Sequence, residues 1–357
     1  MAKRVVVWGT GNVGRPAIRA VVSHRDLELV GVIVSNPEKV GKDAGELAGI
    51  APLGIVATDD WKSLVASDID ALVYAANADT RGEEAFLELM ACLQAGVNVV
   101  SSAFYPLLYP PVGLKQAVEP IQALCEQAGS SVFVSGIDPG WAMDILPVLL
   151  SGVVADIEEI RAQEIFNYAL YDQPEVVREV IGFGKPMDAV PRMLQDDALK
   201  TVWAPMVQQL ADALAYPLDS IATSVERRPL VQDISVPGMG EFKAGTQGAF
   251  RFEVRGMRKG HARIVVEHIT RIDDSCAPEW PYPSVGRGCH QVIIKGSPEL
   301  IVSAHGHDPI EPGPAGGGNS SAANRIVNAI PAVCDAAPGI VSSIDLPGIH
   351  GGAQMQE

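Results

Sequence analysis

The sequence predicts an α/β protein that begins with a doubly wound parallel sheet and continues into a region of longer antiparallel strands. Near the N-terminus a buried strand runs directly into a glycine-rich turn, and strand and helix patterns then alternate as far as residue 140. Beyond residue 150 the strand patterns lengthen and are joined by glycine turns. A chain of 357 residues is long enough for two such domains.

The first element is a strand over Arg4–Trp8, a run of β-branched and aromatic residues typical of a strand buried on both faces. Three glycines follow it in the pattern G-x-G-x-x-G, and apolar residues at helical spacing come next. In a dinucleotide site the first glycine allows the tight turn, the second admits the pyrophosphate, and the third lets the helix pack on the strand. Such glycines also occur for packing alone. The sequence predicts that this turn binds a dinucleotide through Gly9, Thr10, Gly11, Asn12, Val13 and Gly14.

The alternation then continues, which is the signature of a parallel sheet covered by helices. Further strands are predicted over 27–35, 71–77, 98–102 and 130–136. Helices rich in Glu, Gln, Ala and Leu are predicted over 82–95 and 114–128. Together these elements make one doubly wound domain.

The end of the second strand predicts which cofactor is preferred. NAD-preferring sites place Asp or Glu there to bind the ribose hydroxyls. This chain has Ser35 and Asn36 instead, with Lys39 and Lys42 nearby. A carboxylate would repel the additional phosphate of NADP, whereas a hydroxyl and lysines would not. We therefore expect NADP(H) to be preferred over NAD(H), with a plain solvated loop as the alternative.

Polar residues also follow the later strands. In an open parallel sheet the ligand lies beyond the carboxyl ends of the strands. We therefore expect Asn77, and Ser101 or Ser102, to form hydrogen bonds with the nicotinamide and its ribose. Ordinary turn residues are the alternative interpretation of each.

The composition is that of a soluble enzyme with a formal net charge of −16. This charge argues against a nucleic-acid partner, because phosphate binding needs a basic surface. The most apolar stretch, 145–155, is too short to span a bilayer, so we expect a core element there and no membrane partner. No signal peptide is expected, and five cysteines without zinc-site spacing suit reduced thiols in the cytoplasm.

Residues 135–147, SGIDPGWAMDILP, combine a glycine–proline turn with a following aspartate and a Leu-Pro pair. With the opening glycine turn and the stretches 164–186 and 322–333, they resemble the dihydrodipicolinate reductase-like oxidoreductases. Within that family the resemblance is nearest to the branch of 2,4-diaminopentanoate dehydrogenase and the native amine dehydrogenases.

This resemblance covers most of the chain and implies a Rossmann domain over 1–140, completed by the C-terminal segment 319–357. It also implies a second α+β domain with an open mixed sheet over 141–318, and usually a homodimer. Strands near 250–300 carry apolar residues on both sides in places, which is more than one helix layer needs to bury. We therefore expect a homodimer formed through the open face of this sheet.

The chain departs from this family after the strand that ends in NVVSS. The amine dehydrogenases carry a glutamate there, a few residues before a Tyr-Pro pair, and it serves the amine chemistry. When Tyr109-Pro110 is aligned with that pair, Tyr105 and Pro106 stand in place of the acidic residues. The lysine and histidine signature of true dihydrodipicolinate reductases is missing as well. Tyr105 is therefore a candidate catalytic acid in reduction, because a pKa of about 10 makes tyrosine a reluctant base.

Glu164 is the second catalytic candidate. The stretch 157–172 alternates and places Glu164 in an otherwise apolar row with Phe166 and Tyr168. If that row faces the substrate, desolvation is expected to raise the pKa of Glu164 and make it a proton donor to a C=O or C=N group. A carboxylate paired with a neighbouring arginine is the alternative.

The histidines give weaker signals. His268 shares a strand face with two β-branched residues, so we expect a packed or interface histidine rather than a catalytic one. His305, His307 and Asp308 lie where the strands give way to a Pro/Gly linker, and we expect no metal site there.

These observations predict an NAD(P)H-dependent oxidoreductase that transfers a hydride to or from a small carbonyl, imine or amine. Trp141 and Tyr168 are expected to form the wall of the substrate pocket, with a core role as the alternative for Trp141. The missing glutamate leaves open a second possibility, a non-catalytic redox sensor that binds NAD(P).

Overall fold

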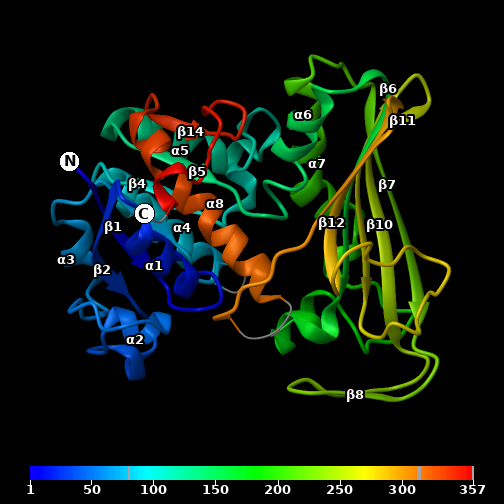
Figure 1. The fold of residues 1–357 in the computed structure, drawn as a ribbon, viewed down its shortest axis with the longest axis horizontal. Coiled ribbons are helices and arrows are strands. Elements are labelled where there is room, and N and C mark those ends of the chain that lie inside the picture. The colour runs from blue at the N-terminus through cyan, green and yellow to red at the C-terminus, as the bar shows by residue number, and fades with distance from the viewer. Residues whose placement is uncertain (79–80, 172, 312–314, 356–357) are drawn as a thin grey trace. The chain divides into compact units, whose positions relative to one another are not determined.

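The computed structural model describes residues 1–78, 81–171, 173–311 and 315–355. They form two compact units, each with a sheet of its own (Figure 1). The N-terminal unit holds Met1–Gly140 together with Asp308–Glu311 and Gly318–Glu357. The second unit begins at Trp141 and continues to His307.

The N-terminal unit is built on six parallel strands in the order β14-β5-β4-β3-β1-β2. The strands are β1 Lys3–Trp8, β2 Leu27–Ile33, β3 Ala71–Tyr74, β4 Asn98–Ser101, β5 Ser131–Val134 and β14 Gly339–Val341. The helices are α1 Gly14–Ser23, α2 Ala44–Ala48, α3 Trp61–Val65, α4 Gly82–Gln94, α5 Lys115–Ala128 and α8 Gly316–Asp335. Because β1 stands between β2 and β3, the strand order reverses beside β1, and ligands of such sheets bind at the carboxyl ends of these strands.

Burial accounts for the apolar character of these strands. Every residue of β3 and β5 is buried, and Val5 and Val7 of β1 belong to one core with residues of α1 and α8. Helices on both faces of a doubly wound sheet require strands that are apolar throughout. The predicted parallel sheet is confirmed, although β2 ends two residues and β3 three residues earlier than predicted.

The second unit contains a mixed sheet in the order β13-β12-β6-β11-β10-β7. The strands are β6 Ala155–Asn167, β7 Ser220–Pro229, β10 Gln247–Arg258, β11 His261–Arg271, β12 Gly288–Ser297 and β13 Leu300–Ala304. β6 pairs in parallel with β11 and antiparallel with β12, so the mixed sheet that the family resemblance implies is confirmed. The remaining elements include α6 Ile145–Ser151, α7 Asp196–Ala213 and a separate hairpin of β8 Ile234–Val236 and β9 Gly240–Phe242.

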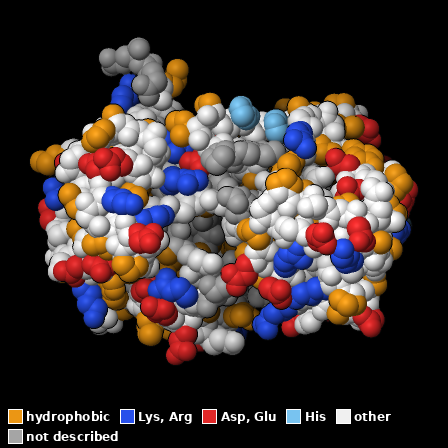
Figure 2. All heavy atoms as spheres, turned by 90° about the horizontal axis from the view of Figure 1, so that it is seen from below, with side chains coloured by type: hydrophobic (Ala, Val, Ile, Leu, Met, Phe, Trp, Pro, Cys, Tyr) orange, Lys and Arg blue, Asp and Glu red, His pale blue; other side chains and the backbone are white. Residues whose placement is uncertain are grey.

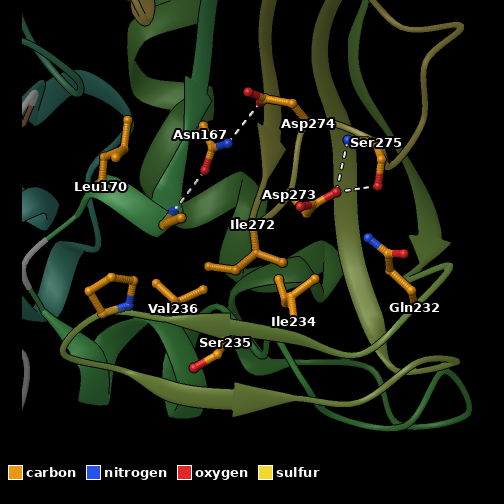
Figure 3. Close-up of a pocket in the computed structure, with 12 residues that line it drawn as sticks. Asn167, Leu170, Gln232, Ile234, Ser235, Val236, Ile272, Asp273, Asp274 and Ser275 are labelled. Carbon is orange, nitrogen blue, oxygen red and sulfur yellow. Dashed lines mark hydrogen bonds between the residues drawn. The ribbon is translucent and has the colours of Figure 1, made fainter.

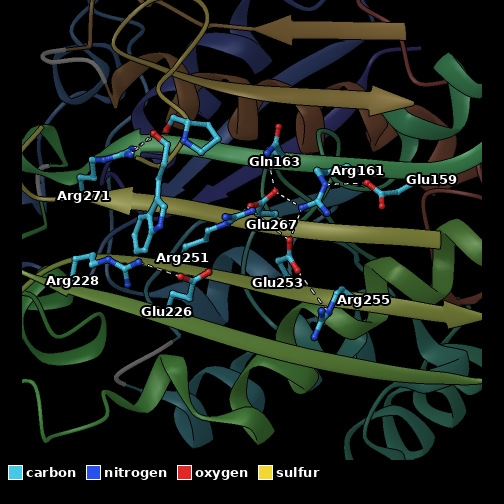
Figure 4. A network of polar contacts seen from close by, with 12 residues as sticks. Glu159, Arg161, Gln163, Glu226, Arg228, Arg251, Glu253, Arg255, Glu267 and Arg271 are labelled. Carbon is cyan, nitrogen blue, oxygen red and sulfur yellow. Dashed lines mark hydrogen bonds and ion pairs between the residues drawn. The ribbon is translucent and has the colours of Figure 1, made fainter. Parts of the chain in front are cut away.

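The two faces of this sheet differ in chemistry. In Figure 1, α7 lies along one face, where it packs on β10 and β11. On the opposite face, which we call the open face, charged side chains form a network that Figure 4 shows. Glu267 lies at its centre, fully buried, with Arg161 and Arg251 bound to its two carboxylate oxygens. A buried carboxylate needs such partners, because an unpaired charge is costly away from water.

The apolar stretch 145–155 is only partly a core element. It forms α6 and a following turn, and Leu149 and Val153 are 66% and 67% exposed. The expectation of a core element was therefore wrong for these two side chains. Among the residues that the structure describes, no helix is both long enough and apolar enough to cross a membrane. On the face drawn in Figure 2, acidic and basic side chains are interspersed.

Candidate functional site

The glycine turn between β1 and α1 has a different constraint at each glycine. Gly9 has a φ of +106°, a conformation that other residues rarely adopt. A Cβ atom on Gly14 would lie 2.0 Å from the carbonyl oxygen of Gly9, whereas one on Gly11 would meet no atom within 4 Å. The first glycine thus makes the turn, the third permits close packing, and the second leaves space in front of the α1 N-terminus. This is the division of roles that a pyrophosphate requires.

Cationic side chains flank the same turn. Lys39 lies in a short helical turn over Pro37–Lys39, and its Nζ is 3.1 Å from the Thr10 carbonyl oxygen and 3.0 Å from the Thr10 Oγ1. Burial, and then the charges of Arg15 and Lys42, lower the pKa of Lys39. Three cations therefore lie close enough to influence one another, and such a cluster favours an anion between them.

Ser35 and Asn36 lie between β2 and the helical turn that carries Lys39. Both are exposed directly after β2, and the Asn36 side chain accepts a hydrogen bond from the Glu38 amide at 2.9 Å. Arg15 is held from the other side, since its guanidinium lies 2.6 Å from the buried carboxylate of Glu311. Sequence reasoning missed Arg15, although its place directly after Gly14 puts it in the first turn of α1.

The polar residues expected at the carboxyl ends of β3 and β4 differ in how deeply they are buried. Ser101 is fully buried, and its hydroxyl donates to the Tyr74 carbonyl at 2.8 Å and accepts from the Ala103 amide at 3.0 Å. That hydroxyl joins β4 to β3. Ser102 is half-buried and Asn77 is exposed, so these two retain surface for a ligand.

Tyr105 follows a strained residue. Phe104 has a φ of +63° and a ψ of +44°, which is unusual for a bulky side chain. Its ring is 4% exposed and packs between Tyr74 and Phe86, at centroid distances of 5.0 and 5.3 Å. Strain of this kind persists only where the surroundings over-determine it, and it is frequent at functional sites. Phe104 thereby sets where the chain places Tyr105 at the start of a short helix over Tyr105–Leu107.

Three ionisable residues form a row across the second sheet. Glu164 on β6 stands directly opposite His268 on β11 and His290 on β12, so all three side chains lie on the face that carries α7. They are 8%, 5% and 5% exposed. His268 Nδ1 is 3.5 Å from Glu164 Oε1, and His290 Nε2 is 3.6 Å from Glu164 Oε2. The Tyr168 hydroxyl donates to Glu164 Oε1 at 2.9 Å. We call these four residues the histidine–glutamate row.

The expectation that burial raises the pKa of Glu164 and makes it a proton donor was wrong. Burial by itself would raise the pKa of this carboxyl, but the charge and hydrogen bond of His268, followed by those of His290, hold the pKa well below its usual range. Glu164 is therefore an ionised carboxylate with histidine partners on neighbouring strands. Among the residues that the structure describes, its charged partners are these histidines and not the suggested arginine; Arg161 on the same strand points to the open face.

The residues predicted to form the pocket wall, Trp141 and Tyr168, do not line the cavity that the structure shows in the second unit. That cavity measures about 500 Å³ and lies between the ends of β6 and β11 and the β8–β9 hairpin (Figure 3). Its lining includes Asn167, Leu170, Ile234, Val236, Asp273 and Asp274. Tyr168 instead bonds Glu164 and stacks on Tyr171 at 5.1 Å, and Trp141 is half-buried at the start of the unit.

His305 and Asp308, which follow β13, form hydrogen bonds with nearby backbone and side-chain groups. His305 Nδ1 is 2.7 Å from the Gly288 carbonyl. The Asp308 carboxylate binds Ser320, Arg19 and the backbone amides of Ile310 and Glu311. The contact of His305 lies within the second unit and those of Asp308 within the N-terminal unit, and each ties neighbouring segments of its own unit together.

Comparisons with known proteins identify the family of this chain. Residues 141–356 match the family described as the 2,4-diaminopentanoate dehydrogenase C-terminal domain, and residues 3–103 match the dihydrodipicolinate reductase N-terminus. The chain is 47% identical to an amine dehydrogenase of Streptomyces virginiae over 96% of this chain and 95% of that one. It is 25% identical to the 2,4-diaminopentanoate dehydrogenase of Acetoanaerobium sticklandii, over 96% and 93%. The solved structure of an amine dehydrogenase from Mycobacterium smegmatis has the same fold, with a TM-score of 0.77, 23% identity and 99% coverage of both chains.

Proposed function

The chain belongs to the family of the 2,4-diaminopentanoate and amine dehydrogenases and is an oxidoreductase, and from this premise we propose that it interconverts a small carbonyl compound and the corresponding amine with NADP(H). Relatives named as amine and 2,4-diaminopentanoate dehydrogenases support the amine as substrate. The observation that carries the proposal within this chain is the histidine–glutamate row, which places a buried carboxylate where the rest of the strand face is apolar.

The cofactor is proposed to bind at the carboxyl ends of β1 and β3. The open space at Gly11 and the packing of Gly14 on Gly9 fit a pyrophosphate, and Asn12 and Val13 lie in the same turn. Asn77 and Ser102 are proposed to contact the nicotinamide end. When bound, NADP(H) supplies or accepts the hydride. The overall reaction is R₂C=O + NH₃ + NADPH + H⁺ → R₂CHNH₂ + NADP⁺ + H₂O.

The protein supplies orientation and a proton. We propose Tyr105 as the proton donor in reduction, because a tyrosine hydroxyl is protonated at neutral pH. Glu164 is proposed to lie beside the reacting nitrogen as a carboxylate, with Trp141 and Tyr168 as neighbouring walls. Apolar and aromatic walls with a few polar groups are typical of sites for small molecules.

A substrate panel tests this function. Small ketones and aldehydes are offered with NADPH, with and without ammonium chloride, and loss of nicotinamide absorbance is followed. We expect oxidation of NADPH that depends on ammonia for at least one carbonyl compound. Oxidation that is equally fast without ammonia would assign carbonyl reduction instead, and no oxidation across the panel would contradict the proposal.

We expect NADPH to bind more tightly than NADH, and Ser35→Asp to reverse this order. The new carboxylate would lie where the 2′-phosphate approaches Lys39 and would repel it, by about tenfold or more in Kd. Titration of intrinsic fluorescence with both cofactors measures the four affinities. Ser67→Asp, which adds the same charge at an exposed serine just before β3, away from the carboxyl ends of the strands, is the control. Equal affinities in the parent protein would contradict the prediction.

The assembly is proposed to be a homodimer through the open face. Ile293 and Ile301 lie on this face beside the charged network, and Ile301 is 56% exposed. An exposed apolar edge next to satisfied charges is typical of protein interfaces. We expect Ile301→Glu to convert the dimer to a monomer in light scattering at micromolar concentration. Val56→Glu, at a 60% exposed valine of the N-terminal unit, is the matched control and keeps the dimer. A monomeric parent would contradict this assembly.

The site of action is proposed to be the cytoplasm, with small molecules rather than nucleic acids or membranes as partners. All five cysteines are free, which suits a reducing compartment. The net charge of −16 disfavours binding to phosphate backbones.

A further inference from the structure

Glu311 binds two arginines of α1 from a distant part of the chain. Its Oε2 lies 2.6 Å from Arg15 Nη2, and its Oε1 lies 2.8 Å from Arg19 Nη1. The side chain of Glu311 is 5% exposed, and 296 positions separate it from Arg15. Arg15 and Arg19 are four residues apart and therefore lie on the same face of α1. One buried carboxylate thus bridges the first two turns of the helix that follows the glycine turn.

The turn that carries Glu311 is fixed by Asp308. The Asp308 carboxylate accepts hydrogen bonds from the backbone amides of Ile310 at 2.8 Å and of Glu311 at 3.2 Å. It also accepts from the Ser320 hydroxyl and lies 3.4 Å from Arg19 Nη2. Both acidic residues belong to the N-terminal unit, as α1 does. Glu311 is therefore held in place by its backbone as well as by the arginines that it binds.

Arg15 keeps donors for a second anion. A guanidinium has five N–H donors, and among the described residues Glu311 is the one hydrogen-bond acceptor of the Arg15 side chain. That side chain is 34% exposed. Burial and then the charge of Arg15 lower the pKa of Lys39, so the two cations lie near each other beside the glycine turn. Arg15 is therefore shared by a buried carboxylate and by the cationic cluster that the 2′-phosphate is proposed to approach.

We propose that Glu311 is a positioning residue that limits the preference for NADP(H), because its carboxylate competes with the 2′-phosphate for Arg15. This inference rests on the proposed function, which places the 2′-phosphate beside Lys39. An arginine bonded to a buried carboxylate is partly neutralised, so it attracts a second anion less strongly. NAD(H) has no phosphate at this position and takes no part in the competition. Glu311 therefore acts on the choice between the two cofactors rather than on the binding of their common adenosine.

Substitution of either partner leaves no buried charge alone. In Glu311→Gln, Arg19 retains Asp308 at 3.4 Å and the Ala48 carbonyl at 2.8 Å, and glutamine keeps the size of the side chain and an acceptor for Arg15. In Arg15→Gln, Glu311 retains Arg19 at 2.8 Å. A buried charge that keeps a partner avoids the main cost of breaking an ion pair. We therefore expect both variants to fold, and unfolding midpoints check this.

Two fragments of the cofactors isolate the 2′-phosphate. Adenosine 2′,5′-bisphosphate and adenosine 5′-monophosphate differ in that group alone, and neither carries a nicotinamide that could react. Isothermal titration at about pH 8, where the phosphate is a dianion, gives the ratio of the two affinities. We expect Glu311→Gln to raise the preference for the bisphosphate by about threefold or more, because a nearby negative charge is removed. Arg15→Gln is expected to lower it by a similar factor, and the affinity for the monophosphate should stay unchanged in both.

The double variant tests whether Glu311 acts through Arg15. In the Arg15→Gln background, Glu311→Gln is expected to change the ratio little, whereas independent effects would multiply. Glu311→Asp withdraws the charge from the arginines by one methylene; it is expected to raise the ratio less and serves where Glu311→Gln does not fold. Glu28→Gln removes the same charge from an exposed residue near the start of β2, at the other end of that strand from Ser35, and is the control that keeps the parental ratio.

The parent protein separates this inference from the proposed cofactor. Equal affinities of the parent for the two fragments would contradict the proposed preference for NADP(H). If the folded Glu311 variants then gain a preference for the bisphosphate, the competition stands without that preference; if they gain none, both proposals fail. A parental preference that these variants leave unchanged or lower, or that Glu311→Gln raises fully without Arg15, overturns the competition and leaves the proposed cofactor in place.

Discussion

Gly14→Ala is expected to unfold the N-terminal unit or to destabilise it by about 3 kcal/mol or more, because the new methyl group would lie 2.0 Å from the backbone oxygen of Gly9. Both atoms belong to the tight turn between β1 and α1, so neither can move without breaking it. Gly11→Ala is expected to leave the unfolding midpoint unchanged, because its methyl group meets nothing within 4 Å.

The same two variants separate packing from cofactor binding. Gly11→Ala fills the space in front of α1 and is expected to weaken NADPH binding by about tenfold or more, because a pyrophosphate needs close approach to that backbone. Thermal unfolding and fluorescence titration with NADPH measure the two effects. Gly82→Ala, at an exposed glycine at the start of α4 with no atom within 4 Å, is the control for both. Parental NADPH affinity in Gly11→Ala would show that the pyrophosphate lies elsewhere.

Tyr105→Phe is expected to lower kcat for reduction by about 10²-fold or more, the usual contribution of a general acid. NADPH affinity should stay unchanged, and kcat and kcat/KM should fall together, because the hydroxyl acts only in the transition state. Steady-state kinetics with the best substrate of the panel decide this. Tyr216→Phe, which removes a hydroxyl from a 37% exposed tyrosine, is the control. If kcat of Tyr105→Phe stays near that of the parent, the proton comes from another group.

Glu164→Gln is expected to lower kcat by a similar factor but to raise KM for the amine as well. The difference from Tyr105→Phe follows from the charge state of Glu164, which binds the substrate nitrogen in the ground state rather than donating a proton. An unchanged KM for the amine, combined with a lower kcat, would return Glu164 to the role of proton donor.

The fold of the N-terminal unit could be predicted from short contiguous stretches of the sequence. The strand, glycine turn and helix from Lys3 to Ser23 are contiguous, and each glycine has a constraint that short-range geometry imposes. The continuous apolar runs of the parallel strands were equally readable, because burial on both faces leaves no room for polar residues. The family resemblance, which rests on the opening glycine turn and the stretches 135–147, 164–186 and 322–333, could also be stated from the residues and was confirmed.

The state of Glu164 required the tertiary structure. The alternation over 157–172 placed it in an apolar row, but the rows of β11 and β12 come from residues about a hundred positions further along the chain. Only strand pairing brings His268 and His290 beside it, and a slip of one residue in either strand would turn that histidine to the open face. A pKa depends on charges within a few ångströms, so its direction follows from register, which no local pattern contains.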